Sequence, residues 1–130
     1  MALFLFFVSL KCAHKNNQKH FYLKPTKQIL ELVTLFYKTG YIAGFCLLKH
    51  RSSKGLVLKV LLKHHLGSHG SIDKLCTFST STVQKFITHK HLWLTNSNGG
   101  TLFLNTPFGC VTLNDAKKLN TGGELLLFVA

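Results

Sequence analysis

The chain has 130 residues, of which 46% are hydrophobic, and it carries 16 Lys and Arg against 4 Asp and Glu, a formal net charge of +12. This length allows one domain, or two small halves that share a linker, with a core of moderate size. So large an imbalance destabilises a compact chain by self-repulsion unless a polyanion or an anionic surface neutralises it, and we therefore expect nucleic acid as the partner.

The apolar start, MALFLFFVSL, raises the question of a targeting segment. It has no basic region before the apolar run and no small-residue cleavage site after it, and it is far too short to span a bilayer. We predict an amphipathic first helix over residues 2–14. Because the start also lacks the Arg- and Ser-rich composition of a transit peptide, an organellar protein of this sequence is expected to be made inside the organelle.

A short strand over 21–24 and a second helix are expected next. Pro25 precedes a helix start at Thr26, and Gly40 stands where a helix C-cap belongs. Apolar residues at helical spacing predict one buried stripe, formed by Ile29, Leu32, Val33, Phe36 and Tyr37.

The next apolar runs, 41–49 and 56–63, flank a turn composition at 51–55 and predict a hairpin. We expect a third strand near 72–78 to complete the sheet after a basic loop over 64–70. The fold class that follows is α+β, with two N-terminal helices packed on a small three-stranded sheet.

The Ser/Thr-rich stretch 79–82 is the predicted boundary between an N-terminal α/β half, 1–78, and a C-terminal half, 79–130. In the second half we predict a strand over 83–94, with Lys85 and Lys90 outward and Phe86 inward, then a turn over 96–100.

A further strand is expected over 101–104, followed by a tight turn that contains Gly109. Thr112 and Asp115 have the spacing of a capping box and predict a short helix that Gly122 ends. The terminal run 124–130 predicts a buried strand, so this half is mostly β with one short helix.

The residues give little support for catalysis, a metal or a cofactor. The four acids, Glu31, Asp73, Asp115 and Glu124, are far apart in the sequence, and no nucleophile motif, P-loop or dinucleotide-binding turn is present. The histidines at 64, 65 and 69 and at 89 and 91 have no nearby cysteine, which disfavours structural zinc. Four scattered cysteines, Cys12, Cys46, Cys76 and Cys110, are typical of reduced, mostly buried thiols. We predict neither an enzyme nor a cofactor.

Two blocks of sequence resemble a known family. In the C-terminal block a polar residue precedes Thr-x-x-Gly, a helix that starts with Thr carries paired lysines, and Gly-Gly-Glu comes before an apolar strand. The residues of this pattern are Asn105, Thr106, Gly109, Thr112, Lys117, Lys118, Gly122, Gly123 and Glu124. Residues 32–45, LVTLFYKTGYIAGF, form the second block. Together they resemble the bacterial-type small-subunit ribosomal protein eight family, while residues 50–80 match poorly.

The resemblance implies a structural protein of the small ribosomal subunit that binds the central domain of small-subunit ribosomal RNA, supports its assembly and has neighbouring ribosomal proteins as partners. The expected RNA-binding residues are Asn105, Thr106, Pro107, Phe108, Gly109, Gly122, Gly123, Glu124, Thr26, Lys27, Lys85 and Lys90. Asn105, Pro107 and Phe108 depart from the family's usual serines and basic residue, and Phe108 can stack where hydroxyls are missing.

The dominance of Lys, Phe and Asn indicates an A/T-rich genome, so we expect an organelle-encoded mitochondrial form, with a plastid less favoured. The alternative hypothesis is a basic peripheral protein that binds anionic membranes through its apolar N-terminus.

Overall fold

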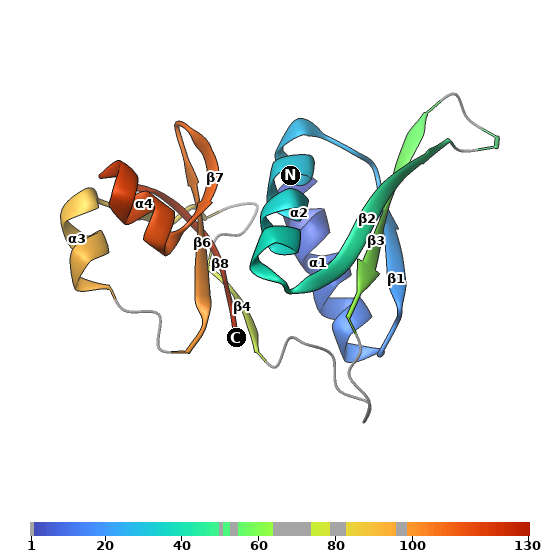
Figure 1. Ribbon diagram of the computed structural model, residues 1–130, viewed down its shortest axis with the longest axis horizontal. Helices are drawn as coiled ribbons and strands as arrows, with labels where there is room; N and C mark the ends of the chain where they lie inside the picture. Colours follow the sequence, from blue (N-terminus) through green and yellow to red (C-terminus); the bar gives the residue numbers. More distant parts are fainter. Residues whose placement is uncertain (1, 50, 53–54, 64–73, 79–82, 96–98) are drawn as a thin grey trace. The chain divides into compact units, whose positions relative to one another are not determined.

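The computed structural model describes residues 2–49, 51–52, 55–63, 74–78, 83–95 and 99–130. The chain divides into two compact units, Met1–Ile72 and Asp73–Ala130 (Figure 1). Both are mixtures of helix and antiparallel sheet, which confirms the predicted α+β class. The boundary predicted at 79–82 and the loop predicted at 64–70 lie outside the described residues.

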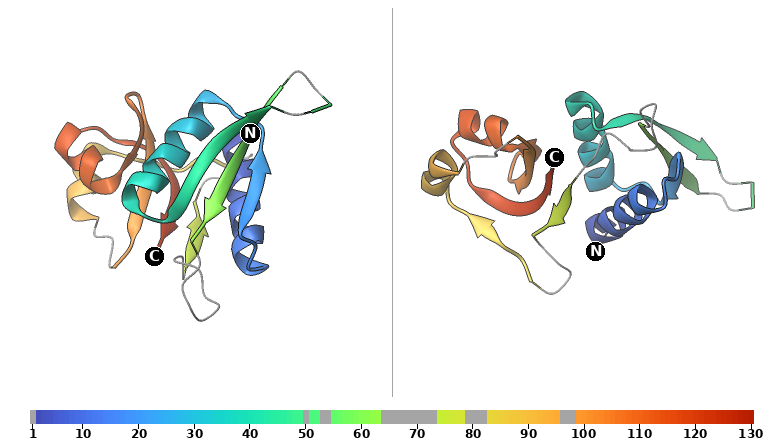
Figure 2. Two further views of the ribbon diagram at one scale, coloured as in Figure 1. Left: turned by 45° about the vertical axis from the view of Figure 1, so that its right-hand side comes forward. Right: turned by 90° about the horizontal axis from the view of Figure 1, so that it is seen from below.

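The first unit is a helix pair on a three-stranded antiparallel sheet. The strands lie in the order β1-β3-β2, and both helices lie on the same face of the sheet (Figure 2). The elements are α1 (Ala2–Lys15), β1 (His20–Leu23), α2 (Lys27–Thr39), β2 (Ile42–Lys49) and β3 (Leu56–Leu62).

Helix α2 begins and ends where the sequence predicts. The Thr26 hydroxyl accepts a hydrogen bond from the Ile29 N–H at 3.3 Å, and Gly40, at φ 86°, is the left-handed C-cap. Four residues of the predicted stripe, Ile29, Leu32, Val33 and Phe36, are buried. Tyr37 is 54% exposed, so its predicted burial is wrong.

Aromatic rings of α1 make much of the first core. The Phe6 ring is fully buried, and its centroid lies 5.6 Å from that of Phe36 and 6.2 Å from that of Phe21. Phe7 and Leu10 are buried with it. The predicted first helix is confirmed, and one apolar stripe of it packs within the unit, while Phe4, Leu5 and Val8 are exposed. No helix among the described residues is long and apolar enough to cross a membrane.

The second unit is a five-stranded antiparallel sheet with two short helices. Its path is β4-β8-β6-β7, and β5 also pairs with β8. The elements are β4 (Leu75–Thr77), β5 (Phe86–Ile87), α3 (His89–Leu94), β6 (Thr101–Thr106), β7 (Gly109–Thr112), α4 (Leu113–Leu119) and β8 (Gly123–Val129). Its core includes Leu92, Leu102, Leu104, Leu113 and Ala116.

Helix α4 has the predicted capping box. The Thr112 hydroxyl donates to the Asp115 carboxylate at 3.1 Å and accepts from the Asp115 N–H at 3.4 Å. The helix ends at Asn120, which takes the left-handed conformation at φ 52°, so the prediction that Gly122 ends it is wrong. An asparagine can occupy this conformation at modest cost, which leaves Gly122 for another role.

Two strand predictions are wrong. The strand near 72–78 does not complete the first sheet, because β4 pairs with β8 of the second unit, whereas β1 is the third strand beside β3. The strand predicted over 83–94 is instead the two-residue strand β5 followed by α3. Phe86, expected to point inward, is 70% exposed.

The four cysteines form no disulfide, but Cys12, Cys46 and Cys76 are exposed and Cys110 is half-buried. The prediction of mostly buried thiols is therefore wrong.

We expect Phe6→Ala to lower the free energy of unfolding by about 3–5 kcal/mol, because it removes a fully buried ring from the first core. The matched control is Leu5→Ala on the same helix, where the side chain is 61% exposed. Urea denaturation followed by circular dichroism measures both. Equal losses in the two variants would contradict this account of the core.

Candidate nucleic-acid interface

The turn between β6 and β7 is held by a buried threonine. The Thr106 hydroxyl donates to the Gly109 carbonyl oxygen at 2.9 Å and accepts from the Phe108 N–H at 3.2 Å. Gly109 has φ 113°, which side-chain-bearing residues rarely adopt. Pro107 and Phe108 are exposed at the tip, Phe108 by 72%. The turn therefore presents an aromatic ring, while its threonine mainly holds the turn together.

The glycine pair at the start of β8 lies against the main chain of the same unit. A Cβ on Gly123 would overlap the Asn105 carbonyl oxygen and lie 3.1 Å from Thr106 Cγ2. A Cβ on Gly122 would overlap the Ile87 carbonyl oxygen and lie 3.0 Å from the His89 nitrogen. Both glycines are thus required by the chain's own packing, whatever else approaches them.

Strand pairing brings the two predicted corners together. Asn105 of β6 is opposite Glu124 of β8, and Gly123 packs on the carbonyl of Asn105. On the other edge of β8, Glu124 is opposite Phe86 of β5, and on β7 Cys110 is opposite Asn105. The row Phe86, Glu124, Asn105 and Cys110 crosses four strands, and we call it the end row. Of the predicted residues, Asn105 and Glu124 belong to it, and Thr106 to Gly109 and Gly122 to Gly123 adjoin it.

Two predicted lysines lie on either side of β5: Lys85 directly precedes the strand, and Lys90 belongs to α3, which follows it. Lys85 is exposed, and its carbonyl oxygen accepts a hydrogen bond from the Leu125 N–H at 2.8 Å, which fixes the residue beside β8. Lys90 is exposed in α3. The ammonium group of Lys117 donates to the Thr95 carbonyl at 3.1 Å and so links α4 to the end of α3.

The remaining predicted residues, Thr26 and Lys27, belong to the first unit. Thr26 is the half-buried N-cap of α2, and Lys27 is exposed at the start of that helix. The structure gives Thr26 a capping role in that unit.

Phe86 is the residue of this surface that the sequence did not reveal. It is exposed at one end of the end row and is opposite Glu124. Lys85 and Lys90 were expected to point outward from a strand over 83–94 with Phe86 inward, but β5 has only two residues. The available signal in the sequence was an aromatic residue next to a lysine.

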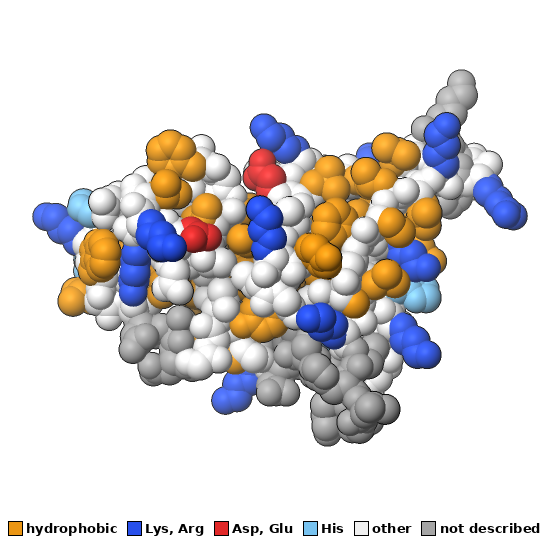
Figure 3. All heavy atoms as spheres, in the orientation of Figure 1, with side chains coloured by type: hydrophobic (Ala, Val, Ile, Leu, Met, Phe, Trp, Pro, Cys, Tyr) orange, Lys and Arg blue, Asp and Glu red, His pale blue; other side chains and the backbone are white. Residues whose placement is uncertain are grey.

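Positive charge is distributed over both units and is not concentrated in one arm. Figure 3 shows lysine and arginine side chains over each unit, with few acidic ones on the face in view. Glu124 is half-buried in the end row, and Asp115 is engaged as a helix cap. This distribution suits several separate phosphate contacts more than one localised anion.

A metal site has no support in the described residues, where no three His, Cys, Asp or Glu side chains gather. His91 Nδ1 lies 2.7 Å from the Thr88 hydroxyl oxygen, a hydrogen bond within α3 and its N-cap. The histidines at 64, 65 and 69 lie outside the described residues.

Comparison with known proteins agrees with the C-terminal pattern and the fold. Residues 5–130 match the model of the family described as Ribosomal protein S8. The chain is 27% identical over 107 residues to "Small ribosomal subunit protein uS8m" of Acanthamoeba castellanii, covering 81% of this chain and 80% of that protein. It is also 26% identical over 125 residues to "Small ribosomal subunit protein uS8" of Metamycoplasma arthritidis (strain 158L3-1), covering 95% and 91% respectively.

A similar match is found outside the bacteria: over 115 residues the chain is 26% identical to "Small ribosomal subunit protein uS8" of Nanoarchaeum equitans (strain Kin4-M), covering 88% of this chain and 85% of that protein. The fold, the glycine corners and these matches define a structural protein of the small ribosomal subunit, not an enzyme. The chain belongs to the ribosomal protein S8 family.

We expect Gly123→Ala to lower the free energy of unfolding by about 1–3 kcal/mol, because the new methyl group must displace the Asn105 carbonyl. Gly44→Ala is the control, since a Cβ there meets only Leu61 Cδ1, at 4.0 Å. Chemical denaturation measures both. If Gly123→Ala were as stable as the wild type, the close approach of β8 to β6 would be contradicted.

Proposed function

We propose that the second unit binds small-subunit ribosomal RNA through the end row and its two adjoining corners, and that the protein does so in a mitochondrial ribosome. The observation that carries the proposal is the pairing of Asn105 with Glu124, which puts both glycine corners at one place on the sheet. Its action is positional: the protein holds a local RNA shape and catalyses nothing.

The chemistry of the corners suits RNA. The wide, shallow minor groove of an RNA helix displays 2′-hydroxyl groups and base edges, which amides, carboxylates and main-chain groups can reach. Asn105 can donate and accept, and the Glu124 carboxylate can accept from a hydroxyl or from a base amino group. Because glycine brings the main chain of β8 close to β6, the corner has little side-chain bulk between Asn105 and Glu124.

Two exposed phenylalanines supply a second kind of contact. Phe108 at the β6–β7 turn and Phe86 at the end of the row are both largely exposed. Unpaired bases stack on such rings without regard to sequence. Lys85 and Lys90, close to Phe86 in the chain, are placed to neutralise phosphates, which positions the RNA more than it specifies its sequence.

The mitochondrial part of the proposal has separate support. One relative carries the name uS8m, and the abundance of Lys, Phe and Asn fits an A/T-rich genome. The membrane alternative is not favoured, since Phe6, Phe7 and Leu10 of the apolar N-terminus are buried in the first core.

The test is ultraviolet crosslinking of ribosomes from purified mitochondria, with mass spectrometry of the RNA-linked peptides. We expect this protein in the small subunit, with adducts in the peptides that contain 105–109 and 122–124. Adducts found only in other segments would disprove the assigned contacts. Recovery of the protein only with cytosolic ribosomes would disprove the location.

We expect Phe108→Ala to weaken binding to the crosslinked RNA stem by about 1–3 kcal/mol, the usual range for one base–aromatic stack. Filter binding at fixed salt measures the affinity, and thermal unfolding confirms that the fold is kept. Phe4→Ala, which truncates an exposed phenylalanine of the first unit, is the matched control. Equal affinities for wild type and Phe108→Ala would show that this ring does not stack on RNA.

A further inference from the structure

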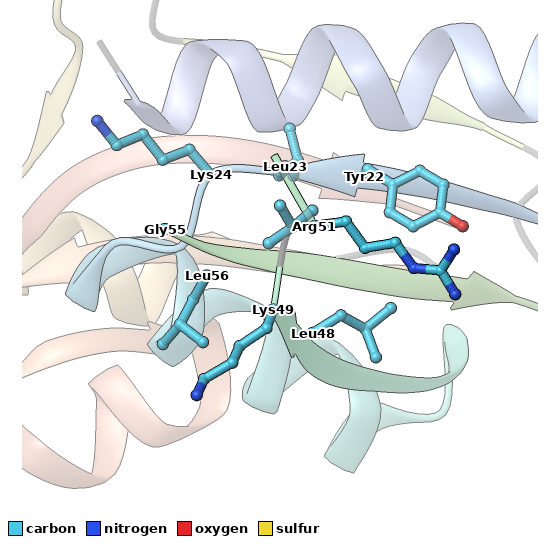
Figure 4. A pocket seen from close by; sticks show the side chains of 9 residues that line it. Tyr22, Leu23, Lys24, Leu48, Lys49, Arg51, Gly55 and Leu56 are labelled. Atoms are coloured by element: carbon cyan, nitrogen blue, oxygen red, sulfur yellow. The ribbon is translucent and has the colours of Figure 1, made fainter. Parts of the chain in front are cut away.

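A pocket lies at the turn end of the β2–β3 hairpin and is formed wholly by residues of the first unit. Its volume is about 930 Å³, and residues of β1, β2 and β3 and of the segments that flank them line it. Figure 4 shows their side chains. We call it the hairpin pocket. None of the RNA-binding residues predicted from the sequence lines it.

The floor of the hairpin pocket is the sheet face that the helices leave uncovered. Leu58 and Val60 of β3 are buried on the helix side. Because side chains alternate along a strand, Val57 and Lys59 point to the other side. Tyr22 is paired with Lys59 and Leu48 with Val57, which places these side chains on that same uncovered face. The Lys59 ammonium lies 5.9 Å from the centroid of the Tyr22 ring.

Apolar groups dominate this floor and its rim. On the floor, Tyr22 is 52% exposed and Leu48 43%, although each is a large hydrophobic side chain. Leu56, which is 49% exposed, belongs to the rim, because its pairing with Lys49 places it on the other face of the sheet. A concave group of exposed apolar side chains on a sheet is typical of a surface that a partner covers.

The charged side chains of the pocket all have one sign. Lys24, Lys49 and Arg51 line it, and among the described residues no acidic side chain does. Arg51 is the chain's only arginine, the side chain best suited to hold a carboxylate through two parallel hydrogen bonds. In Figure 4 its guanidinium points to the same side as the Tyr22 hydroxyl, whereas the ammonium groups of Lys24 and Lys49 extend in other directions. An occupant of the uncovered face thus meets Arg51 beside Tyr22 and Leu48.

We propose that the hairpin pocket binds a segment of another protein chain in which acidic side chains accompany apolar ones. A carboxylate of that segment pairs with Arg51, and its apolar side chains cover Tyr22 and Leu48. RNA suits the pocket less well, because aliphatic side chains offer no platform for bases and, of the residues that the structure describes, Tyr22 alone gives the lining an aromatic ring. A second copy of this chain also fits poorly, since its four acidic residues are isolated from one another in the sequence.

This partner site is separate from the proposed RNA contacts of the second unit and does not depend on them. Loss of RNA binding after Phe108→Ala would leave it intact. Loss of peptide binding in variants of the pocket would equally leave the proposed RNA contacts standing.

The test is fluorescence anisotropy with the full chain and four labelled probes of equal length. They are a peptide in which leucine alternates with glutamate, one in which serine alternates with glutamate, one in which leucine alternates with lysine, and an oligouridine RNA. The protein variants are Leu48→Ser and Arg51→Ala. Lys38→Ala, which removes an exposed lysine of α2 outside the pocket, is the matched control. Circular dichroism confirms that each variant is folded.

We expect the Leu/Glu peptide to bind most tightly and both pocket variants to weaken it roughly tenfold, with Lys38→Ala close to wild type. The Ser/Glu peptide should bind more weakly, because it lacks the apolar contacts. No binding of the Leu/Glu peptide, or equal loss in Lys38→Ala, would overturn the proposal. Tighter binding of oligouridine that the same pocket variants abolish would also overturn it and would make the hairpin pocket an RNA site.

Discussion

The pairing of β6 with β8 is the constraint on which the candidate interface depends. It requires a residue without a side chain at 123, because the Asn105 carbonyl occupies the space of a Cβ. Once the strands are this close, Asn105 is opposite Glu124, and the turn that ends β6 lies beside the corner that begins β8. Residues separated by a whole helix, α4, thereby become neighbours. A substitution at Gly123 changes the fold and any ligand contact together, so exposed side chains such as Phe108 are better probes of binding.

Local signals in the sequence predicted the helices well, and non-local pairing explains most of the errors. Thr26, Gly40 and the Thr112–Asp115 pair act within one or two turns of their own helix, so their roles can be read without the rest of the chain. The partner of Leu75–Thr77 is β8, at the far end of the chain, and no local pattern specifies that choice. The segment 83–94 is too short and too mixed for hydrophobic periodicity to separate a two-residue strand from the helix after it.

The sequence pointed to most residues of the candidate site, but it missed Phe86 and did not reveal how the others pack. The glycine corners and Phe108 stand out in the sequence, whereas the reason for the glycines appears only in three dimensions. Gly122 and Gly123 make room for the chain's own carbonyl groups at Ile87 and Asn105. The Thr106 hydroxyl, which looks available in the sequence, is buried and bonded within its turn. An interface built this way presents amide, carboxylate and aromatic groups on a main chain that is already fixed. Binding would therefore lose little main-chain entropy.

The two units use their apolar and charged residues differently. In the first, Phe6, Phe7 and Leu10 of α1 are buried in the core. The outer face of the sheet, with Tyr22 and Leu48, is not covered by the helices. In the second, the exposed aromatics Phe86 and Phe108 lie at or beside polar groups of the end row. Aliphatic and aromatic surfaces select different partners. An aliphatic surface excludes water best against another polypeptide, whereas an aromatic surface can also stack on bases. The excess of lysine, which both units share, favours binding of an anionic partner to either one. The two surfaces therefore differ in the type of their exposed apolar side chains, which are mostly aliphatic in the first unit and aromatic in the second.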